Sequence, residues 1–229
     1  MLKPKINRTV LIKVLLCLSA LTLIVVYEAN YYKENSKLGI PRIKNLNVPF
    51  TSQAPEADWQ EPWLNACEET TIIMADNFYK DENITPEKAR EQILKILAIK
   101  EMSFGESKDE SMERIAEIVN LAELPWQATV SINPLLNDIK KEIAAGRPVI
   151  VPIDARLLQN SPYKGELDYH VLIISGYDDA RQEFIVQDPG TKGGKDDRYD
   201  YQNFYSAIND FLPNATPSGR KAVLFTAPK

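Results

Sequence analysis

The alternation of hydrophobic and polar positions divides the chain into an apolar N-terminal run, a region of helical spacing and a region of short β-rich runs. The apolar run, residues 14–26, contains no charged residue. From residue 65 to residue 146 apolar residues recur at helical intervals, and from residue 148 onward they form short blocks. These are the periods of amphipathic helices and of strands. We therefore expect helices first and a sheet second.

Four helices are predicted from capping patterns and apolar stripes. Asn65 with Glu68 three residues later is the pattern of a capping box, and it predicts a helix that ends near residue 79. Thr85-Pro86 predicts the start of a second helix, and residues 111–121 have the apolar spacing of a third. Asn133-Pro134 predicts the start of the fourth.

Four strands are predicted in the second half, at residues 148–153, 169–175, 183–187 and 222–226. A turn is expected at 176–179, and residues 190–200 are expected to form a polar loop. Helices followed by strands in one domain indicate the α+β class.

The N-terminal segment is interpreted as a targeting segment, separate from the fold. Four basic residues, Lys3, Lys5, Arg8 and Lys13, precede its apolar run. We expect residues 1–27 to be an uncleaved membrane anchor or, as the alternative, a cleaved signal. Residues 28–39 are expected to be a polar stalk, and residues 40–229 a domain outside the cytoplasm.

The charge of the expected domain disfavours nucleic acid as a partner. Residues 1–27 hold 4 of the 27 basic residues and none of the 32 acidic ones, so residues 28–229 carry a net charge of −9. Nucleic-acid affinity comes from basic patches. The domain has one cysteine and one histidine, which are too few for a zinc site, so no metal or cofactor is expected.

Cys67 and His170, the one cysteine and the one histidine of the expected domain, are the combination that thiolate catalysis needs. The imidazole takes the thiol proton, and a third group orients the imidazole. The predicted cap places Cys67 at the second position of its helix, where unpaired N–H groups and the helix dipole favour a thiolate. Glu68 and Glu69 oppose this by adding negative charge beside the sulfur. The alternative is that Cys67 has no catalytic role and is a buried, unreactive core residue.

The expected hairpin supplies Asp188 as the third group. Pairing Leu172 with Val186 and Ile174 with Phe184 places large apolar residues opposite each other on one face. The same register places His170 opposite Asp188. Directly opposed Cβ atoms lie about 4.5–5.5 Å apart, which is close enough for a carboxylate to hold one imidazole nitrogen.

A tetrahedral oxyanion also needs hydrogen-bond donors. The N–H of Cys67 is one candidate. An upstream side-chain amide is the second, and Gln53 and Gln60 are the two choices.

Several short motifs occur in one order along the chain and together resemble the C39-like cysteine peptidases of the papain-like group. They are Asn-Val-Pro-Phe-Thr-Ser-Gln at 47–53, Trp59, Cys67, Met74, Tyr-His-Val at 169–171, Gly-Tyr-Asp at 176–178 and Gln-Asp-Pro at 187–189. The resemblance covers about residues 45–190. It implies a papain-like fold in which the nucleophile lies at a helix N-terminus packed on an antiparallel sheet.

The resemblance also implies a role for each candidate residue. Cys67 would be the nucleophile, His170 the base, Asp188 the group that orients it, and Gln53, in preference to Gln60, the oxyanion amide. The chain departs from the family's common pattern after the cysteine, where Gly-Pro is replaced by Glu68-Glu69.

The leading hypothesis is a membrane-tethered thiol hydrolase, outside the cytoplasm, that cleaves peptide or amide bonds with a Cys-His-Asp triad. Its partners would be a peptide or protein substrate and the membrane. One alternative is a transpeptidase or amide ligase that uses the same pair. The other is a catalytically silent module that binds peptide or cell-wall material.

Overall fold

The computed structural model describes residues 8–37, 39–106, 108–159, 162–163, 167–213 and 218–229. The chain divides into two compact units, residues 1–42 and 43–229. In the first unit, helix α1 (Arg8–Lys37) runs through the apolar run and most of the predicted stalk. Among the described residues, no helix combines the length and the apolar character that crossing a membrane requires. The expected targeting role of residues 1–27, of which 1–7 lie outside the described residues, stays a prediction.

The second unit contains five α-helices within its described residues. They are α2 (Cys67–Lys80), α3 (Pro86–Phe104), α4 (Met112–Leu121), α5 (Leu136–Ala144) and α6 (Tyr201–Ala207). Thr85 caps α3 by accepting the N–H of Lys88, as its position before Pro86 predicts. The fourth predicted helix begins two residues later than Asn133-Pro134 indicates, with Leu135 at its N-cap.

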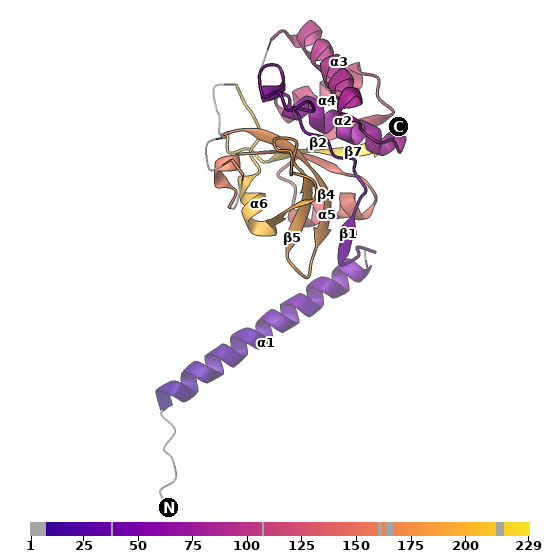
Figure 1. The fold of residues 1–229 in the computed structure, drawn as a ribbon. Coiled ribbons are helices and arrows are strands. Elements are labelled where there is room, and N and C mark those ends of the chain that lie inside the picture. Colours follow the sequence, from indigo (N-terminus) through magenta and orange to yellow (C-terminus); the bar gives the residue numbers. More distant parts are fainter. Residues whose placement is uncertain (1–7, 38, 107, 160–161, 164–166, 214–217) are drawn as a thin grey trace, which may run out of the picture. The chain divides into compact units, whose positions relative to one another are not determined.

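A seven-stranded antiparallel sheet completes the domain. Its main order is β2-β7-β3-β4-β5-β6, and β1 also pairs with β4. The strands are β1 (Ile43–Asn45), β2 (Trp126–Ile132), β3 (Val149–Ile153), β4 (His170–Asp178), β5 (Glu183–Gln187), β6 (Asp197–Asp200) and β7 (Ala222–Pro228). In Figure 1, helices α2, α3 and α4, purple to magenta, gather beyond one end of strands β4 and β5. The predicted α+β class is confirmed, with helices mainly in the first half and antiparallel strands mainly in the second.

Three strand predictions need correction. Strand β4 continues through the predicted turn as far as Asp178, so the chain reverses at residues 179–182 instead. Strand β6 lies in the stretch predicted to be a polar loop, and β2 was not predicted at all. Both are edge strands with partly exposed residues, so they lack the apolar blocks that identify the central strands.

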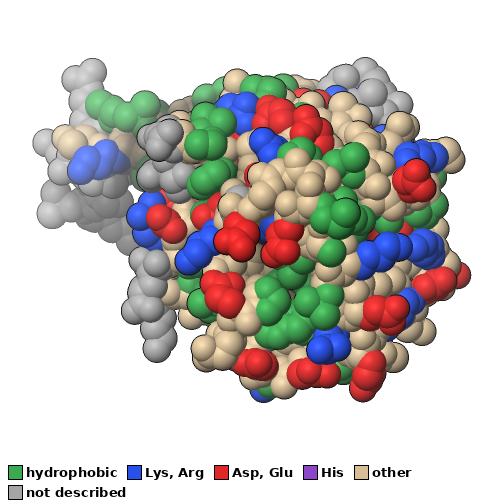
Figure 2. Space-filling view, turned by 90° about the horizontal axis from the view of Figure 1, so that it is seen from above, with side chains coloured by type: hydrophobic (Ala, Val, Ile, Leu, Met, Phe, Trp, Pro, Cys, Tyr) green, Lys and Arg blue, Asp and Glu red, His purple; other side chains and the backbone are tan. Residues whose placement is uncertain are grey.

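The core lies where α2 packs on β4. All nine residues of β4 are buried, because this strand has neighbours on both sides and helices against it. All residues of α2 from Cys67 to Asn77 are also buried, including the polar ones. On the face shown in Figure 2, acidic and basic side chains are interspersed with apolar ones. The first turn of α2 thus brings polar chemistry into a water-poor interior.

Candidate active site

Cys67 is the first residue of α2, and Ala66 is its N-cap. The predicted capping box is wrong, because Asn65 ends the short 3-10 helix Trp63–Asn65 and its side chain donates to Glu61 Oε1 at 2.6 Å. No side chain caps α2. The thiol nevertheless lies in the first helical turn, where the backbone N–H groups have no intrahelical acceptors.

The His170 imidazole and the Asp188 carboxylate form a direct contact. Nε2 of His170 lies 2.8 Å from Oδ1 of Asp188, and both side chains are almost completely buried. The same oxygen accepts the Gly190 N–H at 3.0 Å. Burial alone would raise the pKa of Asp188, but the positive charge that His170 can carry and hydrogen bonds from His170, Tyr163 and Gly190 together hold it below its usual value. Asp188 is therefore a carboxylate held in its charged form.

The predicted contact is present, but the predicted strand register is wrong. Ile174 faces Val186 and Tyr177 faces Phe184, with a bulge between Ile174 and Gly176 that shifts the pairing. Asp188 follows β5 and reaches His170 although it is not its directly opposed partner. Such diagonal neighbours on one face of a sheet are still within reach of longer side chains. The bulge lies next to the point where β1 pairs with β4, at Asn45 and Gly176. The two strands approach closely there, since a Cβ on Gly176 would lie 2.5 Å from Lys44 O.

Cys67 and His170 line one cavity of about 540 Å³. The other residues around it are Gln53, Trp59, Leu64, Asn65, Asp109, Pro162, Tyr163, Leu167, Asp168, Tyr169 and Gly190. The backbone N–H of Val171, next to His170, contacts the thiol and lowers the pKa of Cys67. Because Nε2 of His170 is bound to Asp188, Nδ1 is the nitrogen left for the thiol. In the part of the chain that the structure describes, no group of three His, Cys, Asp or Glu residues is arranged to hold a metal.

The two candidate amides lie in different surroundings. Gln53 is buried and lines the cavity, whereas Gln60 is exposed and does not line it. The Gln53 amide, however, donates to two backbone carbonyls, that of Trp63 at 3.0 Å and that of Leu64 at 2.9 Å. Both of its N–H groups are thus engaged, and it ties the turn that precedes Cys67 to the loop that follows β1. Oxyanion binding by Gln53 stays a prediction, and it requires the amide to leave these carbonyls.

Two buried glutamates dominate the electrostatics around the thiol. Cys67 Sγ donates to Glu68 Oε2 at 3.6 Å, and Glu68 Oε1 accepts the N–H of Glu110 at 2.9 Å. Burial, followed by the charge of Glu68, raises the pKa of the Cys67 thiol well above its usual value. Burial and the neighbouring Glu69 raise the pKa of Glu68 well above its ordinary range. In this structure the sulfur is therefore a thiol that directs its proton toward Glu68.

Lys100 balances this buried acidic pair. Its Nζ lies 2.6 Å from Glu69 Oε1, and both side chains are at most 2% exposed. Burial tends to lower the pKa of Lys100, but the charges of Glu69 and Glu68 outweigh it and raise the pKa. Because α3 supplies this cation, the acidic first turn of α2 is tolerated in the interior.

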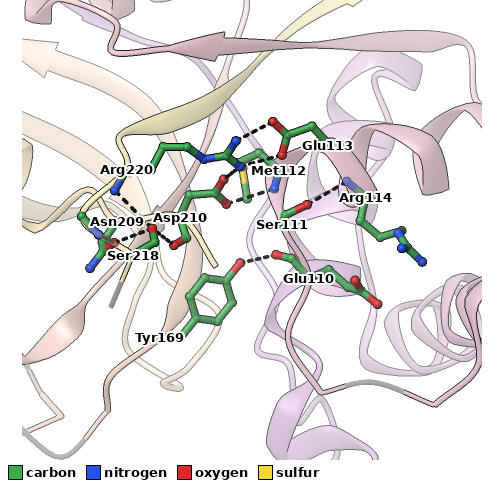
Figure 3. A network of polar contacts seen from close by, with 11 residues as sticks. Glu110, Ser111, Met112, Glu113, Arg114, Tyr169, Asn209, Asp210, Ser218 and Arg220 are labelled. Atoms are coloured by element: carbon green, nitrogen blue, oxygen red, sulfur yellow. Dashed lines mark hydrogen bonds and ion pairs between the residues drawn. The ribbon is translucent and has the colours of Figure 1, made fainter. Parts of the chain in front are cut away.

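A polar network fixes residues 110–114, the segment whose Glu110 N–H binds Glu68 (Figure 3). Tyr169, next to His170, donates its hydroxyl to the Glu110 carbonyl at 2.7 Å. The N–H of Met112 donates to Asp210 Oδ1 at 3.0 Å. Arg220 pairs with both Asp210 and Glu113, as the dashed lines in Figure 3 show. The start of α4 is thus attached to the loop before β7, close to the cavity.

Sequence reasoning missed Tyr163 at this site. Its hydroxyl lies 2.5 Å from Asp188 Oδ1 and 3.0 Å from His170 Nε2. The tyrosine stands in a loop with no distinctive motif, so the sequence alone does not single it out. Trp59 lines the cavity, whereas Trp63, in the short 3-10 helix before Cys67, is buried and does not line it.

Comparisons with known proteins give one family. The model of the Peptidase_C39-like family matches residues 45–211. A candidate C39-like peptidase from Bacillus anthracis has a similar solved structure, with a TM-score of 0.54 and 17% identity over 81% of this chain and 98% of that one. At that identity the similarity shows the fold alone. No curated protein matches the chain.

Proposed function

We propose, from the premise that the chain belongs to the Peptidase_C39-like family, that it is a cysteine peptidase in which Cys67, His170 and Asp188 act as a triad. The observation that carries the proposal is that Cys67 and His170 line one cavity while Asp188 holds the far nitrogen of the imidazole. This supports the proposal, because nucleophilic catalysis by a thiol needs a base that can reach the sulfur and a third group that orients the base.

The proposed reaction begins with transfer of the Cys67 proton to His170 Nδ1. The thiolate then attacks the carbonyl carbon of a peptide or amide, which forms a C–S bond and places negative charge on the carbonyl oxygen. The Cys67 N–H is the backbone donor that we assign to that oxygen. His170 next gives its proton to the leaving nitrogen as the C–N bond breaks. Water, deprotonated by His170, attacks the thioester, and the C–S bond breaks to release the acid and restore the thiol.

A peptide library digested in H₂¹⁸O tests this proposal. Hydrolysis by the full chain places one ¹⁸O atom in each new C-terminus, which mass spectrometry detects. We expect Cys67→Ala and His170→Ala to abolish new termini. Cys17→Ala is the matched control, since it removes the chain's other cysteine, and it is expected to retain activity. New termini that persist in Cys67→Ala would contradict the proposal.

A transpeptidase or amide ligase would use the same pair of residues. Adding an amine acceptor to the digest separates the two outcomes. Transfer gives products that carry the amine, whereas hydrolysis gives ¹⁸O-labelled acids.

A catalytically silent binding module is the alternative that two observations favour. The Cys67 proton points to Glu68, and the Gln53 amide is bound to two carbonyls. A silent module would retain peptide binding in Cys67→Ala with no turnover in any variant, including Glu68→Gln. A Glu68→Gln chain that gains turnover would exclude it.

We also propose that residues 1–27 direct the domain out of the cytoplasm. Basic residues before an uncharged apolar run support this, because the basic flank is retained inside during export. Fractionation with N-terminal sequencing distinguishes the forms. An intact chain in the membrane fraction indicates an anchor, and a shortened chain in the medium indicates a cleaved signal. An intact chain in the cytosol would contradict export.

A further inference from the structure

We infer that Tyr163 is a positioning residue of the catalytic pair, whose hydroxyl joins Asp188 and His170 in one three-way contact and so leaves Nδ1 of the imidazole facing the nucleophile. The inference rests on the proposed function of Cys67 and His170. It adds a third group, the Tyr163 phenol, to the contact between the imidazole and the carboxylate.

The distances define the contact. Tyr163 Oη lies 2.5 Å from Asp188 Oδ1 and 3.0 Å from His170 Nε2, and these two atoms lie 2.8 Å from each other. A carboxylate oxygen only accepts, so the phenol donates its proton to Asp188. The phenol oxygen then presents its lone pair toward Nε2. Tyr163 is therefore bonded to both members of the pair at once.

Proton counting shows what this contact does. Nε2 faces two oxygens, Asp188 Oδ1 and Tyr163 Oη, and it satisfies both only if it carries the hydrogen. In the neutral imidazole the hydrogen is then on Nε2, and the lone pair is on Nδ1. The opposite tautomer would place a nitrogen lone pair 2.8 Å from a carboxylate oxygen. The Tyr163 hydroxyl, like the Asp188 carboxylate, thus favours the Nε2–H tautomer, in which Nδ1 can accept the thiol proton.

Gly190 supplies an independent observation. A Cβ at this position would collide with the Tyr163 hydroxyl and lie 2.9 Å from His170 Cε1. The Gly190 N–H also donates to the same Asp188 oxygen at 3.0 Å. The space that a side chain would fill is therefore occupied by the phenol. Glycine here permits the three-way contact, and any larger residue is expected to displace one of its members.

The full-length chain allows a direct test because His170 is its only histidine. ¹⁵N-histidine labelling gives one imidazole, whose nitrogen shifts report the tautomer without any need for activity. We expect the neutral imidazole of the wild type to be the Nε2–H form. In Tyr163→Phe we expect the Nδ1–H form to become populated. Where turnover is measurable, we expect kcat to fall by about tenfold with KM unchanged.

Tyr79→Phe is the matched control. It removes a tyrosine hydroxyl that lies 2.7 Å from Thr226 Oγ1, away from the cavity. Its imidazole shifts and its kcat are expected to equal those of the wild type. If Tyr163→Phe also matches the wild type in tautomer, the positioning role is wrong, whatever the peptidase assay gives. If the tautomer changes but no variant hydrolyses peptide, the contact stands and the proposed function fails.

A double-mutant cycle tests the role of Gly190. Gly190→Ala is expected to disturb the tautomer as Tyr163→Phe does, because the new methyl group meets the hydroxyl. In Tyr163→Phe the hydroxyl is absent, so adding Gly190→Ala should then have a smaller effect than it has alone. Fully additive effects of the two substitutions would contradict the inference that Gly190 leaves room for the Tyr163 hydroxyl.

Discussion

The carboxylates beside Cys67 and beside His170 have opposite surroundings. Asp188, next to His170, accepts three hydrogen bonds on one oxygen, and its pKa is held below its usual value. Glu68, next to Cys67, is also buried but has Glu69 as its neighbour, and burial and that charge raise its pKa. The comparison teaches that burial does not fix the charge of an acid. The donors around the carboxylate decide whether it supports the adjacent catalytic group or opposes it.

After Cys67→Ala and His170→Ala, which are expected to abolish activity, the largest change in rate is expected from Asp188→Ala. Without the carboxylate, His170 loses the acceptor that fixes its tautomer and stabilises its protonated form. We expect kcat to fall by about 100-fold or more, within the range for general acid–base catalysis. Steady-state kinetics on a peptide found in the library digest measures this. Asp188→Asn keeps an acceptor oxygen and should lose less. An equal loss in both variants would indicate that charge, and not orientation, dominates.

Removing the cation behind Glu68 and Glu69 is expected to have the largest effect on stability. Lys100→Met leaves a buried acidic pair without its ion-pair partner, which costs about 3 kcal/mol of unfolding free energy. Urea denaturation followed by circular dichroism measures it. Lys88→Met, which breaks the more exposed pair with Glu82, is the control and should cost at most about 1 kcal/mol. Equal losses would show that Lys100 is not needed to balance the acids.

Glu68→Gln should make the thiol more reactive. It removes the negative charge nearest the sulfur, and lowering the thiol pKa by one unit increases the thiolate fraction about tenfold at pH 7. Iodoacetamide labelling in a Cys17→Ser chain measures the rate at Cys67 alone. The control is Glu82→Gln, which changes an exposed glutamate. Labelling that slows in Glu68→Gln would mean that Glu68 assists ionisation instead of opposing it.

The smallest expected effect is on the pH dependence of stability. The folded-state pKa of Glu68 lies above its ordinary value near 4.5, so its contribution is fully present below that pH. It is lost as pH rises through the folded-state pKa. From pH 5 to 8 the wild type should therefore lose more stability than Glu68→Gln does. Thermal unfolding across this range measures the difference. The contribution of Asp188 to stability changes with pH in the opposite direction. It is lost only as the pH falls below the ordinary aspartate pKa near 3.8, because the pKa of Asp188 in the folded state is lowered.

Much of the fold follows from local patterns, because caps and apolar blocks act over a few residues. Thr85 and Ser111 cap the helices that the sequence predicts for them. The predicted cap at Asn65 is wrong, because that side chain bonds to Glu61 in a turn that no local rule specifies. Edge strand β6 was missed because its polar residues resemble those of a loop.

The candidate site was predictable as a set of residues and less so as a geometry. The His170–Asp188 contact is present although the register that predicted it is wrong, since a side chain spans the diagonal of the sheet. The bulge beside Gly176 lies where β4 pairs with β1, a strand more than a hundred residues away in sequence, so local patterns do not specify it. Tyr163 and Lys100 reach the site only through tertiary packing. Neither has a nearby motif that would identify it.

The network in Figure 3 has a consequence for how the protein is made. Arg220 near the C-terminus is attached to Glu113 at the start of α4, and β7 fills the place between β2 and β3. A chain still under synthesis has its cysteine and histidine long before it has these last residues. Such a chain lacks a central strand of its sheet and the guanidinium that pairs with Glu113 and Asp210. The cavity is thus expected to form only after Arg220 and β7 have been synthesised, and chains truncated before them are expected to be inert.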